Sequence, residues 1–295
     1  MLMKRIPDIT LSNGVKMPAL GFGVAALGNG QEFRKAVDSA LDCGYRLFDT
    51  APFYGNESEL GDVLRHCGVA REELFISTKL PNACHAYEDT IAAFHRALEG
   101  MGLDYLDMFL IHFPVPKLGL YPEAWRAMVK LYEQGLVRVI GVSNFQEKHL
   151  KVLFEKSDMK PMTNQIECNP YLSVAPLRKF CSDNGIRVMN WFPLGGPREP
   201  LVPYPTNDFK VLLEDPTLTA IGKKYGKSAA QVALRWAVQN SITPIPKSAN
   251  PKRIRENTEI FDFELSQDDM DMIAQLDHER RLGPDPDEFD DMEMG

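Results

Sequence analysis

Short apolar segments alternate with amphipathic helical segments along most of the chain, and this alternation constrains the fold more than any other feature. Apolar runs of a few residues predict buried strands, whereas apolar residues repeating every three to four positions predict helices. A strand, a helix and another strand in succession are typical of a parallel sheet, because parallel strands need a crossover connection. About eight such units fit into this chain, and that number predicts a closed (β/α)8 barrel.

The same periodicity places the elements along the sequence. Strands are expected at 19–23, 46–48, 74–78, 106–111, 137–142, 163–167, 187–191 and 242–244. Helices are expected at 32–43, 57–66, 87–101, 122–134, 146–155, 174–184, 228–239 and 251–256, with an additional C-terminal helix at 266–276.

The two ends of the chain carry extra segments. Asn13 and Gly14 stand between alternating residues, a pattern that predicts a β-hairpin before the first barrel strand. No long linker or low-complexity break follows, so we expect a single domain over residues 1–295. Residues 284–295 are acidic and contain two prolines, which indicates a mobile surface tail rather than a further domain.

A Rossmann nucleotide-binding fold is the rival interpretation. Gly21, Gly23 and Ala26 match the pattern GxGxxA, and Asp49 ends the next predicted strand. A helix should open directly at those glycines, but the sequence Gly-Asn-Gly at 28–30 interrupts before any helical periodicity begins. The barrel therefore remains the preferred interpretation.

Composition excludes several classes of partner. A net charge of −8 and a pI near 5.4 argue against binding to nucleic acid or to an anionic membrane surface. No apolar run approaches the roughly 20 residues needed to span a bilayer, and residues 1–18 lack the apolar core of a signal peptide. We therefore expect a cytoplasmic protein. The five cysteines form no CxxC pair and the six histidines no HExxH motif, so we expect reduced thiols and no metal.

Polar or aromatic residues stand at the end of nearly every predicted strand. In a (β/α)8 barrel these positions meet at one rim and carry the active site. They are Asp49, Lys79, His112, Ser143, Asn144, Gln165, Asn169, Trp191, Lys247 and Ser248.

Asp49, Tyr54, Lys79 and His112 together indicate proton transfer. Asp49 and Tyr54 alone would be explained as a packing ring beside a turn-capping carboxylate. A lysine ammonium beside the phenol, however, would lower the tyrosine pKa from about 10 by roughly three units, and Asp49 would keep that lysine charged. A neutral His112 could polarise a carbonyl oxygen. No side chain supplies hydride, so a nicotinamide cofactor is implied.

With these residues, the chain resembles the aldo-keto reductases nearly end to end. The matching motifs are DTAPFYGNE at 49–57, STKL at 77–80, LIHFP at 110–114, GVSNF at 141–145, NQIECNPY at 164–171, WFPLG at 191–195 and IPKSANPKRIREN at 245–257. The resemblance implies a monomeric barrel that reduces aldehydes and ketones to alcohols with NADPH, with Tyr54 as general acid. The C-terminal LGPDPDEF is most similar to bacterial diketogluconate and glyoxal reductases.

The resemblance also implies the cofactor contacts. Ser143, Asn144 and Gln165 would hold the carboxamide, and Trp191 would stack on the nicotinamide. Further contacts are expected from Leu194, from Lys247, Ser248 and Arg253 around the adenosine phosphate, and from Glu256 and Asn257 near adenine. Two cations beside a helix start suit a 2′-phosphate, which favours NADPH over NADH. Without the motif, these cations would be an ordinary solvated basic face.

The chain departs from the family pattern at two positions. Phe113 stands where a tryptophan is usual, so the substrate pocket should differ in width. Phe192 replaces a serine, which puts one phosphate-side hydrogen bond in doubt. Apolar pocket walls are expected from Val24, Phe53 and Phe113, which suit an aromatic or aliphatic carbonyl. The proline-rich segment 196–212 is a candidate flap over the cofactor.

Two other functions compete with carbonyl reduction. A non-catalytic barrel that binds NADPH as a sensor or partner subunit would share the fold, but this chain retains all four catalytic residue types. A metal-dependent hydrolase would need histidine or carboxylate clusters at several strand ends, whereas His112 is the only histidine at those positions.

Overall fold

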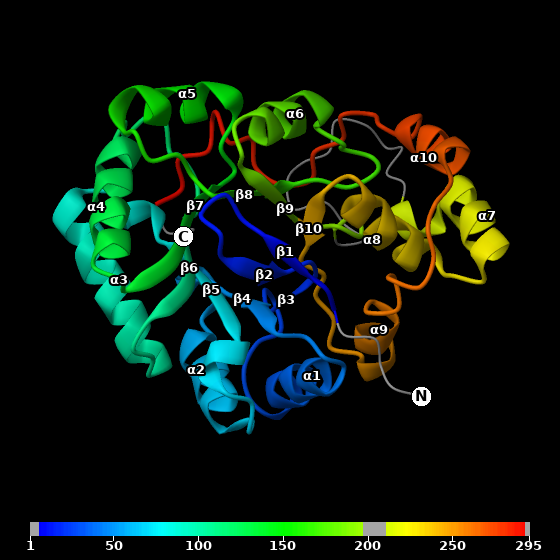
Figure 1. The fold of residues 1–295 in the computed structure, drawn as a ribbon, viewed down its shortest axis with the longest axis horizontal. Coiled ribbons are helices and arrows are strands. Elements are labelled where there is room, and N and C mark those ends of the chain that lie inside the picture. Colours follow the sequence, from blue (N-terminus) through cyan, green and yellow to red (C-terminus); the bar gives the residue numbers. More distant parts are fainter. Residues whose placement is uncertain (1–5, 197–210, 293–295) are drawn as a thin grey trace.

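Parallel strands form the centre of the protein, which we describe from a computed structural model over residues 6–196 and 211–292 (Figure 1). Within these residues an eight-stranded sheet runs in chain order, from β3 to β10. Its strands are β3 (Gly21–Gly23), β4 (Leu47–Asp49), β5 (Phe75–Leu80), β6 (Leu106–Ile111), β7 (Val137–Ser143), β8 (Thr163–Glu167), β9 (Arg187–Trp191) and β10 (Ile242–Pro244). The Gly23 amide donates to the Pro246 carbonyl at 3.1 Å, which nearly closes the barrel. The predicted (β/α)8 fold is confirmed.

Helices surround the strands, so the barrel strands are buried on both faces (Figure 1). They are α1 (Gln31–Asp42), α2 (Glu57–His66), α3 (Tyr87–Met101), α4 (Tyr121–Glu133), α5 (Glu147–Lys156), α6 (Ala175–Asp183), α7 (Pro216–Tyr225), α8 (Ala229–Gln239), α9 (Pro251–Glu256) and α10 (Gln267–Ala274). Short 3-10 helices lie at η1 (Pro52–Tyr54), η2 (Arg71–Glu73), η3 (Asn82–Cys84) and η4 (Leu212–Glu214). The apolar core is one continuous cluster from Ile6 to Ile273.

Helix α3 shows how the sequence pattern produces a buried face. Its buried residues repeat at the three- and four-residue spacing of one helix stripe: Thr90, Ala93, Phe94, Ala97, Leu98 and Met101. The helix ends at Gly102, whose φ of 64° lies in the left-handed region that glycine adopts without strain. The apolar stripe packs against the barrel and against α2 and α4.

Gly61 in α2 makes the close approach to α3 possible. A β-carbon at this position would lie 2.2 Å from the Met101 carbonyl oxygen, so Gly61→Ala should destabilise the fold by about 1–3 kcal/mol despite alanine's better helix propensity. Gly100→Ala is the matched control, because nothing lies within 4 Å of that position, and it should leave stability equal or raise it by up to ~1 kcal/mol. Thermal unfolding measures the stability of both variants, and equal changes in stability would contradict the close approach at Gly61.

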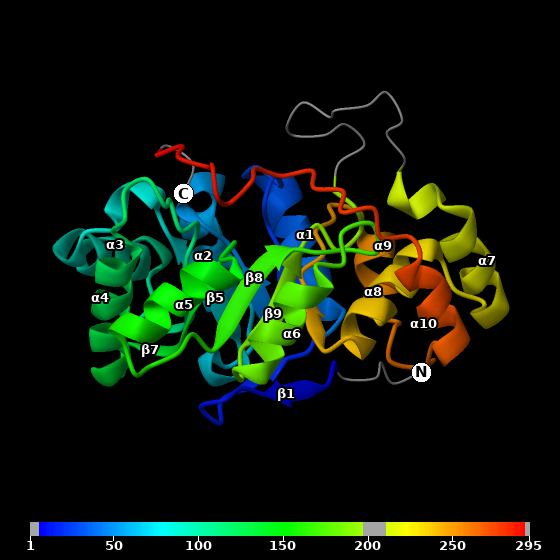
Figure 2. The same cartoon turned by 90° about the horizontal axis from the view of Figure 1, so that it is seen from above.

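The N-terminal hairpin covers the end of the barrel opposite the strands' carboxyl ends. Strands β1 (Asp8–Thr10) and β2 (Lys16–Pro18) pair antiparallel, as the sequence predicts. The side chain of Asn13 donates to the Arg138 carbonyl at 3.0 Å, which ties the hairpin to the start of β7. Figure 2 shows β1 at one end of the barrel and the C-terminal segment crossing the other. The carboxyl ends of the barrel strands therefore face that C-terminal segment.

Helix α7 is the one α-helix of the described residues that the sequence analysis missed. Its signals are present: Asp215 accepts hydrogen bonds from two first-turn amides, Pro216 occupies the first turn, and Gly226 ends the helix at φ 65°. Helix α10 packs against α7 at the side of the barrel. The other predicted elements are present with ends that differ by a few residues. Strand β5 continues to Leu80, so Lys79 lies inside the strand rather than after it.

The acidic C-terminal segment lies across the barrel mouth over residues 284–292 (Figure 2). The sequence predicts a mobile surface tail from residue 284 onward, and that mobility stays a prediction. The Phe289 ring lies 4.4 Å from the Phe113 ring, centroid to centroid, and Asn82 donates to the Asp291 carbonyl at 2.9 Å. Lys148 pairs with Asp287 at 2.8 Å. Acidic residues of the segment thus form ion pairs with lysines at the barrel mouth, and composition alone does not predict these pairs.

Candidate active site

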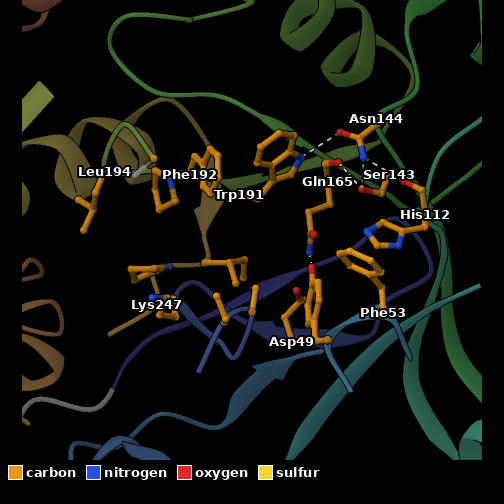
Figure 3. Close-up of a pocket in the computed structure, with 18 of the residues that line it drawn as sticks. Asp49, Phe53, His112, Ser143, Asn144, Gln165, Trp191, Phe192, Leu194 and Lys247 are labelled. Carbon is orange, nitrogen blue, oxygen red and sulfur yellow. Dashed lines mark hydrogen bonds between the residues drawn. The ribbon is translucent and has the colours of Figure 1, made fainter. Parts of the chain in front are cut away.

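A cavity of about 460 Å³ opens at the carboxyl ends of the strands, beneath the C-terminal segment. Figure 3 shows the side chains around it, with His112 and Asn144 on one side and Lys247 and Leu194 on the other. Its lining residues are Gly23, Ala25, Ala26, Asp49, Phe53, Tyr54, His112, Phe113, Ser143, Asn144, Gln165, Trp191, Phe192, Pro193, Leu194, Gly196, Ile245, Pro246, Lys247 and Pro284. Most of the residues that the sequence predicts for the rim therefore share one cavity.

A buried ion pair joins Asp49, which lines this cavity, to Lys79, which does not line it. Lys79, on β5, donates from Nζ to Asp49 Oδ2 at 2.7 Å and to the Thr50 carbonyl at 2.8 Å. Its side chain is 1% exposed, so the ammonium is almost completely removed from water. Burial disfavours the charged lysine, but Asp49 and Tyr54 outweigh that effect and raise the pKa of Lys79 above 10.5. Lys79 is therefore a permanent cation in the site.

Tyr54 lies beside this cation at the end of η1. The Lys79 ammonium is 5.1 Å from the centre of the phenol ring. Burial raises the pKa of Tyr54, and the Lys79 charge opposes that rise without reversing it. The ammonium therefore lowers the phenol pKa as we expected, but desolvation, which the pairwise calculation of charges left out, outweighs it. The net pKa is raised, and Tyr54 stays protonated at neutral pH.

His112 follows β6, and its ring packs against the ring of Tyr54. The two rings meet edge to face, with centroids 6.3 Å apart. Burial, followed by the positive charge of Lys79, holds the pKa of His112 well below 6.5. The imidazole is therefore neutral, as a hydrogen-bond donor to a carbonyl oxygen requires. Its Nδ1 atom is buried without a hydrogen-bond partner among the described residues.

The residues predicted to hold a carboxamide form one hydrogen-bonded chain. The Ser143 hydroxyl donates to the Gln165 carbonyl at 2.8 Å, and the Asn144 amide donates to Ser143 Oγ at 3.1 Å. The side chain of Gln165 donates to Asp49 Oδ1 at 2.9 Å, and Trp191 Nε1 donates to Asn144 Oδ1 at 2.9 Å (Figure 3). This chain connects the indole wall of the cavity to the Asp49–Lys79 pair.

The apolar walls differ from the prediction at one position. Phe53 and Phe113 line the cavity, and the Phe53 side chain is half exposed at its mouth. Val24 does not line it, because its side chain is fully buried in the core. The neighbouring alanines 25 and 26 line the cavity instead. A strand-end position predicts the loop that reaches the site, but the direction of each side chain depends on the local backbone.

The residues predicted for the adenosine end lie around α9. Lys247 lines the cavity, whereas Ser248, Arg253, Glu256 and Asn257 do not. Arg253 is exposed, and Asn257 is buried just after the helix. Phe192 lines the cavity beside Leu194, and its ring packs edge-on against Trp191 at 4.8 Å. Of the predicted flap, residues 197–210 lie outside the described part of the chain.

Sequence reasoning missed Pro284, which lines the cavity, and two residues that lie near the cavity without lining it, Glu167 and Phe289. Glu167 lies two positions after Gln165 on β8, on the same face of the strand. That alternation was a usable signal. Pro284 and Phe289 come from the C-terminal segment, whose composition gave no indication of docking. Within the described residues, no group of three or more histidine, cysteine or acidic side chains could hold a metal ion.

The described cavity fits a nicotinamide dinucleotide. It offers side-chain amides and a flat indole at one end, and a lysine at the other, with apolar walls between them. Such a site suits an aromatic amide ring and a phosphate group.

Among the described helices, none is long and apolar enough to cross a membrane.

Comparison with known proteins identifies the class. A model of the aldo/keto reductase family matches residues 19–278. The glyoxal reductase of Bacillus subtilis is 46% identical over 281 residues, covering 95% of this chain and 96% of that protein. The 2,5-diketo-D-gluconic acid reductase B of a Corynebacterium species is 40% identical over 290 residues, covering 98% and 100%.

The structural comparison agrees. A Bombyx mori aldo-keto reductase crystallised with NADP is 36% identical and has a TM-score of 0.87, and the match covers 96% of each chain. The chain is thus an NADP-dependent oxidoreductase of the barrel type that acts on carbonyl compounds. It belongs to the aldo-keto reductase family. The expected similarity to glyoxal and diketogluconate reductases is confirmed.

Proposed function

We propose that Tyr54 is the general acid of an NADPH-dependent reduction that converts aldehydes and ketones to alcohols. The observation that supports this role is that Asp49, a protonated phenol and a neutral imidazole line one cavity, with the buried Lys79 paired to Asp49. Bound NADPH supplies the hydride to the carbonyl carbon. The proton for the carbonyl oxygen comes from the Tyr54 hydroxyl.

Each neighbour of Tyr54 has a separate part in this proposal. Lys79 stabilises the phenolate that remains after the proton leaves. Two opposite charges 4 Å apart interact by about 4 kcal/mol at an effective dielectric of 20. Asp49 keeps the lysine charged at 2.7 Å. His112 donates a hydrogen bond to the carbonyl oxygen and polarises it. Burial therefore favours the acid form before reaction, and the ammonium favours the base form after it.

The cofactor would lie along the whole cavity. Trp191 would stack on the nicotinamide, and Ser143, Asn144 and Gln165 would hold its carboxamide. At the other end, Lys247 would bind phosphate together with Ser248 and Arg253, while Leu194, Glu256 and Asn257 would complete the nucleotide contacts. The position of Lys247 on the cavity wall, away from His112, supports this orientation (Figure 3).

The substrate would be a small carbonyl compound with an apolar substituent. Phe53, Phe113 and Phe192 supply aromatic walls. Among the described residues that line the cavity, the lysine or arginine present is Lys247, which we assign to the cofactor. We further propose a monomer in the cytoplasm. The large apolar side chains that are exposed in the described chain are scattered over several elements, and all five cysteines are free.

Turnover with a panel of carbonyls tests the proposal directly. The panel holds an aromatic aldehyde, methylglyoxal, a diketo sugar acid and a ketosteroid, and the consumption of NADPH is followed by its absorbance. We expect the aromatic aldehyde to have a higher kcat/KM than the diketo sugar acid. Tight NADPH binding without any turnover would refute the enzyme and favour the sensor function.

The phosphate assignment makes a prediction of its own. Arg253→Ala should weaken NADPH binding by about tenfold or more and leave NADH binding nearly unchanged, because a charge-assisted contact to the 2′-phosphate is worth about 1.5–3 kcal/mol. Dissociation constants for both cofactors check it. Arg255→Ala, at an exposed position on the same short helix, is the control. Equal losses for NADPH and NADH would remove Arg253 from the phosphate site.

A further inference from the structure

The indole of Trp191 is held at both of its ends by other parts of the chain. At one end, Nε1 donates to Asn144 Oδ1 at 2.9 Å. At the other end, the backbone of Gly283 lies directly against the ring. A β-carbon on Gly283 would stand 2.2 Å from Trp191 Cη2, much closer than real atoms approach. The position of the C-terminal segment therefore limits where the indole can lie.

A buried carboxylate holds that segment in place. Glu167 Oε1 accepts from the Leu282 amide at 2.7 Å, and Oε2 accepts from the Gly283 amide at 3.0 Å. The Arg281 guanidinium lies 3.7 Å from Oε2. Glu167 is 1% exposed and stands opposite Trp191 where β8 pairs with β9. Charge-assisted bonds to two consecutive amides are strong in such a dry site.

We propose that Glu167 is a positioning residue, which sets the orientation of the Trp191 indole by fixing the backbone of Leu282 and Gly283. The inference rests on the proposed stacking of nicotinamide on Trp191. Glu167 does not line the cavity, so it acts through the segment and not by touching the substrate. Pro284, the next residue, does line the cavity. The same carboxylate thus fixes the indole and the start of the substrate wall.

Glu167→Gln tests the link with almost no change in size. A glutamine can accept only on its oxygen, so its NH2 group would face one of the two backbone donors and leave it unpaired. We expect amide hydrogen exchange at Leu282 and Gly283 to become at least about tenfold faster, the cost of roughly one lost buried hydrogen bond. The KM for NADPH should rise about tenfold, while kcat changes much less. The emission of Trp191, isolated by subtracting the spectrum of Trp191→Phe, should shift.

Gly283→Ala reaches the same indole directly and keeps the carboxylate. The backbone of Gly283 lies outside the left-handed region, so alanine fits the chain. Its β-carbon would clash mainly with the ring, at 2.2 Å from Trp191 Cη2, and would stand 3.2 Å from Glu167 Oε2. We expect the Trp191 emission and the KM for NADPH to change as in Glu167→Gln. Exchange at Leu282 should change less than in that variant, because the Leu282 amide donates to the other carboxylate oxygen, Oε1. Glu288→Gln is the matched control, because it removes the same charge from an exposed position of the same segment. It should change none of these quantities.

The outcomes separate this inference from the proposed function. Faster exchange with unchanged emission and KM would mean that Glu167 only anchors the segment, and unchanged exchange would also overturn the proposal. If Glu167→Gln does not fold, Gly283→Ala tests the proposal alone. Unaltered Trp191 emission in that variant would then refute the role of the segment in orienting the indole. Absence of turnover in the natural protein would instead refute the enzyme, while exchange, emission and NADPH binding would still test Glu167.

Discussion

Replacement of Tyr54 by phenylalanine is expected to lower carbonyl reduction by at least about a thousandfold, while NADPH still binds. The substitution removes one hydroxyl and leaves the ring, so the contacts with Lys79 and His112 remain. We expect no other side chain of the cavity to replace it. His112 is neutral, Lys79 donates to Asp49 and Thr50 and does not line the cavity, and Lys247 lines its opposite end. Steady-state turnover and fluorescence titration with NADPH measure the two quantities.

Tyr45→Phe is the control for this result. Tyr45 is also fully buried, and its hydroxyl has no hydrogen-bond partner among the described residues, so its loss should change neither turnover nor stability appreciably. Retained turnover in Tyr54→Phe would rule out the phenol as the acid. The pH dependence gives a second check. Because burial raises the pKa of Tyr54, the acid form should persist through neutral pH, and reduction should decline only as strongly alkaline pH is reached.

Replacement of Lys79 by methionine is expected to reduce turnover by about three orders of magnitude. The phenolate would lose a neighbouring charge worth about 4 kcal/mol, and each 1.4 kcal/mol is a factor of ten in rate. The variant should also be less stable by about 3–5 kcal/mol, because Asp49 would remain buried without its partner. Chemical denaturation and turnover at a temperature where the variant stays folded measure the two effects separately.

The double variant Asp49→Asn with Lys79→Met separates catalysis from stability. Removal of both charges should restore most of the lost stability, because no unpaired charge remains, but it should not restore turnover. Lys179→Met is the surface control, since that lysine pairs with Asp183 in solvent and its loss should change little. A mild loss of turnover in Lys79→Met would mean that this cation does not stabilise the phenolate.

The predicted elements show where sequence patterns are informative. The strands at Leu106–Ile111, Thr163–Glu167, Arg187–Trp191 and Ile242–Pro244 were predicted with the observed bounds, because each is a short apolar run between clear turn signals. Helix α7 was missed although Asp215 and Pro216 mark its start, since the proline-rich stretch before it obscured the periodicity. Val24 was predicted for the apolar cavity wall, yet its side chain is buried in the core.

The sequence by itself determined the order of the strand and helix units and the residue type at each strand end, because hydrophobic periodicity and turn residues are local properties. It therefore predicted the barrel and most residues of the cavity. Only the tertiary structure decided the direction of the Tyr54 pKa and the path of the C-terminal segment across the mouth. It also decided the contact of Glu167 with Leu282 and Gly283. The physical reason is that desolvation of Tyr54 depends on the whole assembled cavity. The docking contacts of the C-terminal segment, moreover, join residues more than a hundred positions apart, and no local pattern encodes their distance.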